Sequence, residues 1–258
     1  MSDVRVWLAA LPVLLAAAAF TWAISIPRRN VTIVDTLWPL LFVIAALSYA
    51  LAAADTGPRA TLLLALVSMW GLRLAAHLAW RNRGHEEDRR YRDIRRRNEP
   101  GFALKSLYLI FGFQALLAWV ISLPLAGGIA ATAPLGPLDG LGIALWAVGM
   151  VFEAGGDWQL ARFRRDPANA GRVMDRGLWR YTRHPNYFGD FCVWWGFFLV
   201  ALSGGAWWSV AGPLLMSFLL LRFSGVTLLE KDIGERRPAY AGYVRRTNAF
   251  FPGPPRRL

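Results

Sequence analysis

The sequence predicts an all-α integral membrane protein with about seven transmembrane helices. Of its 258 residues, 55% are hydrophobic and only 18% are charged, whereas soluble globular proteins are about 25% charged. Long apolar runs recur along the chain, and they are continuous rather than alternating, which favours helices over the strands of a membrane barrel. The net charge of +12 is therefore assigned to basic cytoplasmic loops, and no nucleic acid partner is expected.

A bilayer span needs roughly 20 predominantly apolar residues. Seven stretches meet or approach this requirement: 4–26, 31–53, 59–80, 104–126, 138–160, 187–203 and 206–229. The sixth is the weakest, because it is short and because only Gly204-Gly205 separates it from the seventh. The first is interpreted as a span rather than a signal peptide, since its apolar run is long and two arginines follow it.

The basic residues then fall almost entirely on one side of the membrane. The loops after the first, third and fifth stretches share one side with the C-terminal tail. Of the 29 lysines and arginines, all lie in or beside these loops and the tail except Arg5, Arg59, Arg73 and Arg222. The positive-inside rule places the N-terminus outside and the C-terminus in the cytoplasm. We expect one transmembrane domain over residues 1–258, whose cytoplasmic face is formed by loops 81–103 and 161–186 and the tail 230–258.

These loops are too short for a separate nucleotide-binding domain. A βαβ unit needs roughly 30 residues or more, and the sequence contains neither a G-x-G-x-x-G motif after a strand nor a P-loop. Any nucleotide must therefore be held by the loops and by the cytoplasmic ends of the helices. The stretch 127–140 carries little charge and is expected to be a plain connection on the outer side.

The first of these loops interleaves acidic and basic residues. Glu86–Asp88 precede Arg89–Arg92, and Tyr91 lies among the arginines. A loop that only attracts anionic lipid headgroups needs no acids, so this pattern predicts a folded loop that fixes the direction of some arginines. Headgroup attraction remains an equal alternative for Arg95–Arg97.

Two carboxylates lie near the cytoplasmic end of the fifth stretch. Glu153 and Asp157 are four residues apart and share a face of the expected helix. Carboxylates within membrane spans are rare and usually face a cavity or a partner. They either contribute to a ligand site or form internal ion pairs with Arg73 or Arg222.

The segment Gly177–Asp190 carries the sharpest signal. Pro185 disfavours helix at His184, so the sixth span is expected to begin at this point. The start of a helix offers free N–H groups and a positive dipole end, which suit a phosphate, and Asn186 adds a donor there. A turn at the membrane interface explains aromatic residues such as Tyr181, but not the density of polar donors.

Together these motifs resemble the steroid 5-alpha reductase family, and most of all its bacterial members. The resemblance rests on Trp70–Arg73, Glu86–Tyr91, Arg180–Asp190 and the tail Glu230–Tyr243. It implies NADPH-dependent reduction of a carbon–carbon double bond conjugated to a ketone. The substrate would be a 3-oxo-Δ4-steroid or a similar lipid enone, reduced at the cytoplasmic face of a bacterial inner membrane. The arginine excess favours NADPH over NADH, because the 2′-phosphate needs arginine donors.

The resemblance also implies roles for single residues. The family pairs a glutamate on the second span with a tyrosine on the third, beside the substrate ketone. Here the acid position is Asp35, and the tyrosine position is Trp70 or a neighbour. A buried acid that keeps its proton could serve there; alternatively Asp35 pairs with Arg28 or Arg29. The tail residues Glu230 and Tyr243 either close the cofactor site or belong to a capping tail. The expected cofactor residues are Arg73, Arg89, Tyr91, Glu153, Asp157, Arg164, Arg172, Tyr181, His184, Asn186, Asp190, Glu230 and Tyr243, and no metal site is expected.

Two other functions remain open. Isoprenylcysteine carboxyl methyltransferases carry similar His-Pro-x-Tyr-x-Gly turns, and they would use S-adenosylmethionine, which needs fewer phosphate-binding arginines. A non-catalytic protein that binds or transports lipid would bind no nucleotide at all. The identity of a bound small molecule separates the three possibilities.

Overall fold

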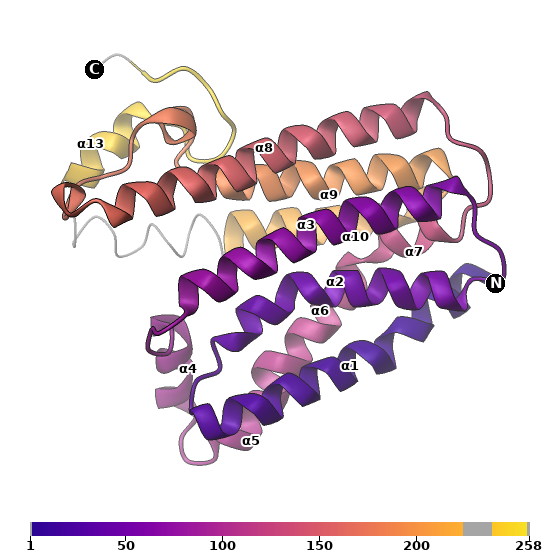
Figure 1. Ribbon diagram of the computed structural model, residues 1–258, viewed down its shortest axis with the longest axis horizontal. Helices are drawn as coiled ribbons and strands as arrows, with labels where there is room; N and C mark the ends of the chain where they lie inside the picture. The colour runs from indigo at the N-terminus through magenta and orange to yellow at the C-terminus, as the bar shows by residue number, and fades with distance from the viewer. Residues whose placement is uncertain (1, 224–238, 257–258) are drawn as a thin grey trace. The chain divides into compact units, whose positions relative to one another are not determined.

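The computed structural model describes residues 2–223 and 239–256, and these residues form helices joined by short connections (Figure 1). No strand occurs among them, which confirms the all-α prediction. The chain divides into two compact units: unit 1 comprises Met1–Gly136 with Val200–Ala211, and unit 2 comprises Pro137–Leu199 with Gly212–Leu258. Each unit is described by itself below.

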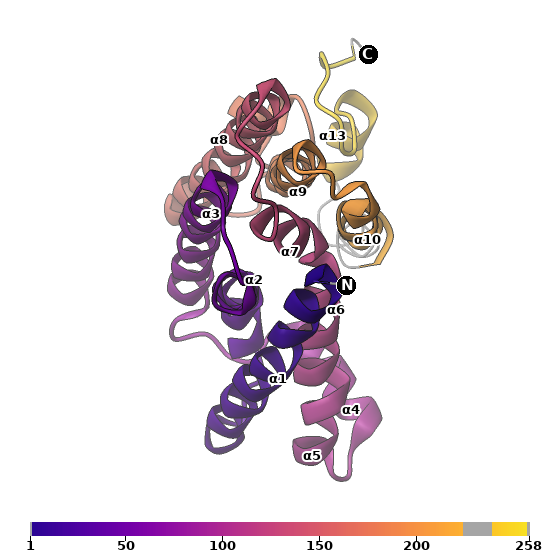
Figure 2. The same ribbon diagram turned by 90° about the vertical axis from the view of Figure 1, so that its right-hand side faces the viewer.

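Unit 1 is built around a central helix, α2 (Ile33–Ala52), which packs against α1, α3, α6 and α7 (Figures 1 and 2). Its core side chains include Leu41, Phe42 and Tyr49, which are fully buried. The other elements of this unit are α1 (Ser2–Arg28), α3 (Pro58–Asn82), α4 (Arg89–Asn98), α5 (Phe102–Ser106), the π-helix η1 (Leu107–Gly112), α6 (Phe113–Ile121), α7 (Leu123–Ile129) and the 3-10 helix η4 (Trp207–Val210).

A buried arginine ties the connection after α7 to the start of α3. Arg59 is fully buried and donates to the carbonyl oxygens of Ala133 and Pro134 at 3.2 and 3.1 Å. It also donates to Oγ of Ser203 at 3.3 Å. A buried charge is tolerated when hydrogen bonds satisfy it. Arg59, which the sequence places on the outer side, therefore joins the start of α3 to these segments.

Unit 2 contains the longest helix, α8 (Pro137–Arg165), together with α9 (Pro185–Ser203), whose residues from Val200 onward belong to unit 1. Its start at Pro185 confirms the expectation from the proline. The remaining elements are the 3-10 helices η2 (Pro167–Asn169) and η3 (Gly177–Arg180), α10 (Ala211–Phe218), the π-helix η5 (Leu219–Phe223) and α13 (Ala239–Arg246).

Glycines bring the backbones of α8 and α9 into close contact. A Cβ atom on Gly149 would lie 2.6 Å from the carbonyl oxygen of Gly189, and one on Gly196 would lie 2.8 Å from that of Gly142. Gly142 and Gly149 are seven residues apart, as are Gly189 and Gly196, so each pair lies on one face of its helix. Small residues at such seams let membrane helices pack closely.

Five helices in the described part of the chain are long and apolar enough to cross a membrane: Val4–Arg28, Ile33–Ala52, Pro58–Asn82, Phe102–Ile121 and Pro137–Arg165. They match the first five expected stretches. Apolar side chains that are exposed on them, such as Phe20 at 69%, would face lipid. The protein is therefore an integral membrane protein. The sixth stretch corresponds to α9, which is not among the five, and Trp207–Arg222 is a shorter apolar helix. The seventh stretch continues outside the described residues, so the number seven and the orientation stay predictions.

The connection between the fourth and fifth stretches is shorter than expected. Instead of an irregular loop over 127–140, α7 runs to Ile129 and α8 begins at Pro137. Gly127 and Gly128 are buried in unit 1, where added Cβ atoms would meet Ala206 and Leu63. The absence of side chains permits this packing, which the glycine composition alone did not reveal.

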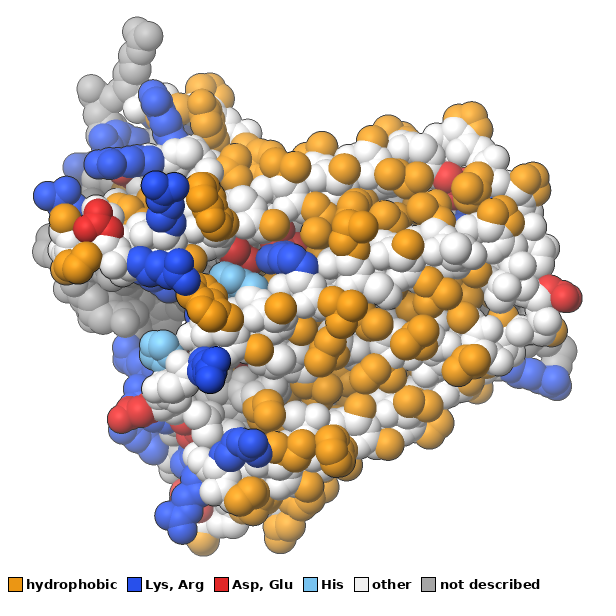
Figure 3. Space-filling model, viewed as in Figure 1, with side chains coloured by type: hydrophobic (Ala, Val, Ile, Leu, Met, Phe, Trp, Pro, Cys, Tyr) orange, Lys and Arg blue, Asp and Glu red, His pale blue; other side chains and the backbone are white. Residues whose placement is uncertain are grey.

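Charge and apolar surface are separated along the helices (Figure 3). Hydrophobic side chains cover the lengths of the long helices in this view. Lysine and arginine side chains gather beyond the C-terminal end of α3 in unit 1, and beyond that of α8 in unit 2. Most of the arginines that could bind a ligand lie at these helix ends.

Candidate functional site

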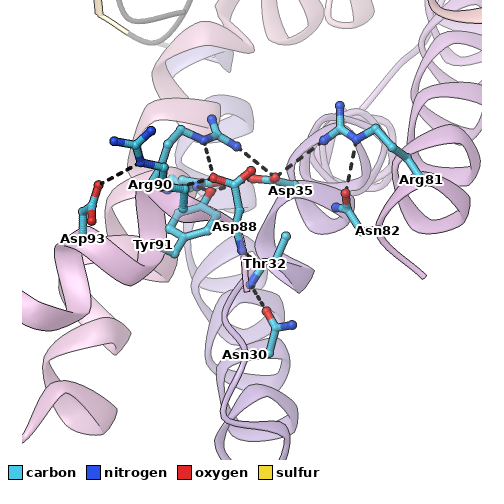
Figure 4. A network of polar contacts seen from close by, with 11 residues as sticks. Asn30, Thr32, Asp35, Arg81, Asn82, Asp88, Arg90, Tyr91 and Asp93 are labelled. Carbon is cyan, nitrogen blue, oxygen red and sulfur yellow. Dashed lines mark hydrogen bonds and ion pairs between the residues drawn. The ribbon is translucent and has the colours of Figure 1, made fainter. Parts of the chain in front are cut away.

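Asp35 is the centre of a polar network in unit 1 (Figure 4). It lies in the first turn of α2, where its backbone N–H donates to the Thr32 carbonyl at 3.0 Å. Tyr91 donates its hydroxyl hydrogen to Oδ1 of Asp35 at 2.6 Å, and Arg90 donates to Oδ2 at 3.2 Å. Arg81, near the end of α3, lies 3.9 Å from Oδ2. The carboxylate thus accepts from a phenol and faces two guanidinium groups.

Asp88 fixes the helix that presents Tyr91. It is the N-cap of α4, and its side chain accepts from the backbone N–H of Arg90 at 2.9 Å, as preferred capping residues do. Its own N–H donates to Oγ1 of Thr32 at 2.9 Å. Burial tends to raise the pKa of Asp88, but the contacts with Arg90 outweigh it, and the pKa lies below its ordinary value.

Glu87 attaches the same loop to the residues before α2. It accepts from the backbone N–H of Val31 at 3.0 Å and pairs with Arg95 at 2.7 Å. Burial would raise the pKa of Glu87, but the hydrogen bonds from Arg95 and Val31 prevail and lower it. The interleaved acids therefore hold this loop in one shape, which confirms the prediction of a folded loop.

The Tyr91 hydroxyl is a hydrogen-bond donor in this setting. Its side chain is buried, and burial raises the pKa of Tyr91, as does the nearby charge of Asp35, while Arg90 only partly opposes them. The phenol therefore keeps its proton at neutral pH. Gln114 on α6 donates to the hydroxyl oxygen at 3.4 Å.

The partner of the acid differs from the one that the sequence suggested. Trp70 is fully buried, and its ring packs against Phe42 at 5.7 Å between centroids. Tyr91, which was expected among the cofactor residues, is the side chain that meets Asp35. The sequence order concealed this because the tyrosine comes from the loop helix α4 rather than from the third span.

Within the described residues, the alternative ion pairs of Asp35 are not formed. Among the described residues, Asp35 pairs with Arg81 and Arg90 and with neither Arg28 nor Arg29. Each of its two oxygens accepts a hydrogen bond in this arrangement, and its expected role as a protonated donor stays a prediction.

Two further arginines of unit 1 were expected to bind cofactor. Arg89 is more than half exposed on α4, 4.0 Å from Asp93. Arg73 is partly buried on α3. Neither makes a hydrogen bond or ion pair with Asp35 in the described part of the chain.

In unit 2 the start of α9 meets the end of α8. Asn186 donates its side-chain N–H to Oδ1 of Asp157 at 3.3 Å. A Cβ atom on Gly156 would lie 3.2 Å from the backbone nitrogen of Asn186, so the glycine permits this approach. Two of the expected cofactor residues are thereby brought together.

A cavity of about 200 Å³ lies between the end of α8 and the loop that follows it. Its lining residues include Arg164, Asp166, Asn169 and Arg172. Asp166 caps η2 by accepting from the backbone N–H of Ala168 at 2.9 Å, which shapes the loop. Two arginines at one cavity make a site suited to phosphate groups.

The segment before α9 is held by the C-terminal tail. Arg183 donates to the carbonyl oxygens of Val244 and Thr247 at 3.2 and 2.6 Å, at the end of α13. The hydroxyl of Tyr243 donates to the carbonyl oxygen of Trp179. These contacts give Tyr243 a structural role and support a capping tail, while a role toward a cofactor stays a prediction.

The other expected residues of unit 2 differ in burial and in their contacts. Glu153 is buried on α8, and His184 is buried with its ring stacked on Tyr187 at 5.6 Å. Tyr181 is 45% exposed. Asp190 is half-buried on α9, directly after Gly189. Glu230 lies outside the described residues.

Several residues of these networks were not predicted. Arg90 lies in the loop whose interleaved acids predicted fixed arginines, but nothing in the spacing of Arg81, Arg90 or Thr32 pointed to Asp35. Gln114 did carry a signal, because a polar amide within an apolar span is rare. No group of three or more His, Cys, Asp or Glu side chains that could hold a metal ion occurs among the residues that the structure describes.

Sequence comparisons show which known proteins this chain resembles. An uncharacterized protein of Schizosaccharomyces pombe is 27% identical over 271 aligned positions, which cover 90% of this chain and 75% of that protein. The 3-oxo-5-alpha-steroid 4-dehydrogenase 1 of mouse and that of rat are each 34% identical over 79 residues, or 31% of this chain. Those matches span 29% and 28% of the two mammalian proteins. No solved structure matches the chain.

A family model matches most of the sequence. It covers residues 21–247 and is described as protein of unknown function DUF1295. This range includes the Asp35–Tyr91 network and the cavity with Arg164 and Arg172. The chain belongs to the DUF1295 family, which is related to the steroid 5-alpha reductases.

Proposed function

We propose that this protein is an NADPH-dependent membrane reductase of a carbon–carbon double bond conjugated to a ketone. The observation that carries the proposal is the 2.6 Å hydrogen bond between Tyr91 and Asp35. It is an acid–phenol pair of the kind that the steroid 5-alpha reductases place beside the substrate ketone. The local similarity to 3-oxo-5-alpha-steroid 4-dehydrogenase 1 supports the same assignment. The substrate is then a 3-oxo-Δ4-steroid or a similar lipid enone.

The arginines of unit 2 fit the proposed cofactor. Arg164 and Arg172 line the cavity of about 200 Å³, and their guanidinium groups would bind the phosphates of NADPH. Asn186 and Asp157, which contact each other at 3.3 Å, offer an amide and a carboxylate for the remaining polar groups. Bound NADPH would supply a hydride to the β-carbon of the enone. The basic loops favour a site that opens to the cytoplasm. We propose that the protein lies in a bacterial inner membrane.

The residues of unit 1 would stabilise the charge that develops on the ketone oxygen. Tyr91 has one phenolic proton, which now points to Asp35. Polarising a ketone requires that this hydrogen bond turn from Asp35 to the substrate oxygen. Arg90, 3.2 Å from Asp35, would stabilise the carboxylate when it loses the phenol. Once turned, the phenol would act as a hydrogen-bond donor aimed at the oxygen on which negative charge develops.

The rival functions predict other ligands. S-adenosylmethionine carries no phosphate, so a methyltransferase would need fewer phosphate-binding arginines than a reductase that uses NADPH. A protein that only binds lipid would bind no nucleotide at that cavity. Both remain alternatives that a binding measurement separates from the proposal.

The test is equilibrium binding of NADPH, NADH and S-adenosylmethionine to the purified protein in detergent. We expect NADPH to bind most tightly, and Arg172→Ala and Asn186→Ala each to weaken it by roughly 10- to 150-fold, the value of one charge-assisted hydrogen bond. Arg176→Ala is the matched control, because Arg176 is exposed in the same loop and does not line the cavity. Preferred binding of S-adenosylmethionine, or unchanged NADPH affinity in both variants, would contradict the proposal.

A further inference from the structure

Gln114 places a polar amide inside a helix that is apolar enough to cross the membrane. It is the second residue of α6, within the candidate span Phe102–Ile121. Polar side chains in such spans are costly and usually serve a partner or a ligand. The partner here is the Tyr91 hydroxyl at 3.4 Å, well beyond the roughly 2.9 Å of a typical N–H···O hydrogen bond.

This contact uses little of what the amide can offer. A glutamine can donate two hydrogens and accept through its oxygen. Among the described residues, the side chain of Gln114 has the Tyr91 hydroxyl as its one hydrogen-bond partner. Neighbours on the same helix, Phe111 and Ala115, are fully buried, whereas Gln114 is only half-buried. One amide hydrogen and the amide oxygen therefore remain for a ligand beside Tyr91.

The local backbone points in the same direction. The π-helix η1, Leu107–Gly112, ends two residues before Gln114. A π turn contains an extra residue, so it shifts the face on which the following side chains lie, and such turns frequently occur at functional sites. Ser106 in the same span shows the contrast, because its hydroxyl is satisfied by the Ala103 carbonyl of its own helix at 2.9 Å.

We infer that Gln114 is a substrate-binding residue whose amide donates a second hydrogen bond to the ketone oxygen of the lipid that approaches Tyr91. The inference rests on the proposed function and adds a donor to it. Tyr91 and Gln114 together form a two-donor site, the arrangement that stabilises negative charge on a carbonyl oxygen. The ligand is an apolar lipid whose single polar end at this site is a ketone.

The test compares two steroids that differ only in that ketone. Androst-4-ene-3,17-dione carries the 3-ketone, and androst-4-en-17-one lacks it. Equilibrium binding of each is measured, without cofactor, for the wild type, for Gln114→Met, which keeps the length of the side chain, and for Gln114→Asn, which shortens it. Ser106→Ala is the matched control for removing a polar group from the same span.

We expect both Gln114 variants to bind the 3-oxo steroid about 3- to 10-fold more weakly, the value of one neutral hydrogen bond. Binding of the 3-deoxy steroid should not change, and Ser106→Ala should change neither. In a Tyr91→Phe background, Gln114→Met should still weaken binding of the 3-oxo steroid. The absence of that additional loss would mean that Gln114 only positions Tyr91.

Three further results would overturn the inference: equal losses for both steroids, no loss for either, or no preference of the wild type for the 3-ketone. The failure of this inference can be distinguished from the failure of the proposed function. A protein with Gln114-dependent binding of the 3-oxo steroid and no NADPH oxidation would retain the binding site without the reductase. A protein that reduces the steroid but binds it equally well without Gln114 would retain the proposed function and contradict this inference.

Discussion

The Asp35 carboxylate lies at the edge of a membrane span, where the hydrogen-bond donors around it stabilise it. Removing such a charge from water costs several kcal/mol unless hydrogen bonds and opposite charges replace the lost hydration. Tyr91 at 2.6 Å and Arg90 at 3.2 Å supply both. The same contact holds the phenolic proton of Tyr91 on Asp35, so the proposed chemistry requires that this hydrogen bond be exchanged for one to the substrate oxygen.

Substitution of Asp35 distinguishes these two roles. Asp35→Asn keeps an oxygen that can accept from Tyr91 but loses the charge opposite Arg90, whereas Asp35→Ala loses both. We expect Asp35→Ala to lower enone turnover by about 100-fold or more and Asp35→Asn to retain part of the activity. NADPH affinity, measured by equilibrium binding, should stay nearly unchanged in both. A parallel loss of NADPH affinity and turnover would instead identify Asp35 as a structural residue.

Glu87 makes the attachment of the loop pH-dependent. Its pKa in the folded protein lies below the ordinary value of 4.5, so its contribution to stability is full above pH 4.5 and is lost as the pH falls through the folded value. A nitroxide on Arg96→Cys, in a Cys192→Ala background, should become more mobile as the pH falls below 4.5. Glu87→Gln should show high mobility at every pH. A mobility that does not depend on pH in the parent would refute this account.

At the scale of the element, the seam between α8 and α9 depends on glycine. Gly149→Ala would place a Cβ atom 2.6 Å from the Gly189 carbonyl oxygen, and overpacking of this kind costs about 1–3 kcal/mol. The apparent Tm in detergent should therefore fall. Gly140→Ala on the same helix is the control, because its Cβ would meet nothing within 4 Å. A fall in Tm of the same size in both variants would show that packing in the seam is not the cause.

Local rules predicted the elements better than they predicted the site. Pro185 fixed the start of α9 because a proline restricts its own backbone and that of the residue before it. The interleaved acids of Glu86–Asp88 predicted a folded loop. The Asp35–Tyr91 pair joins residues 56 positions apart, and it depends on how α4 turns back onto α2. No periodicity or spacing in the sequence encodes such a return, so Trp70 was assigned the place that Tyr91 occupies.

For the whole molecule, the asymmetry of the basic residues predicts the orientation. A reporter fused after Leu258 should be active in the cytoplasm, and one inserted into the connection 130–136 should be active on the opposite side. The reason is the translocation bias against arginine-rich loops. The seven-span arrangement would be refuted if both reporters were active on the same side, or if the reporter after Leu258 were active in the periplasm.

Transfer of hydrogen from NADPH to a lipid enone tests the central claim most directly. The purified protein is incubated with androst-4-ene-3,17-dione and NADPH that carries deuterium as the transferable hydride, and the steroid is analysed by mass spectrometry. We predict a reduced steroid that contains one deuterium from the cofactor and one hydrogen from water. Its rate of formation should fall by about 100-fold or more in Tyr91→Phe, the range for loss of a general acid. A steroid that remains unreduced, or product that forms equally fast in Tyr91→Phe, would contradict the account.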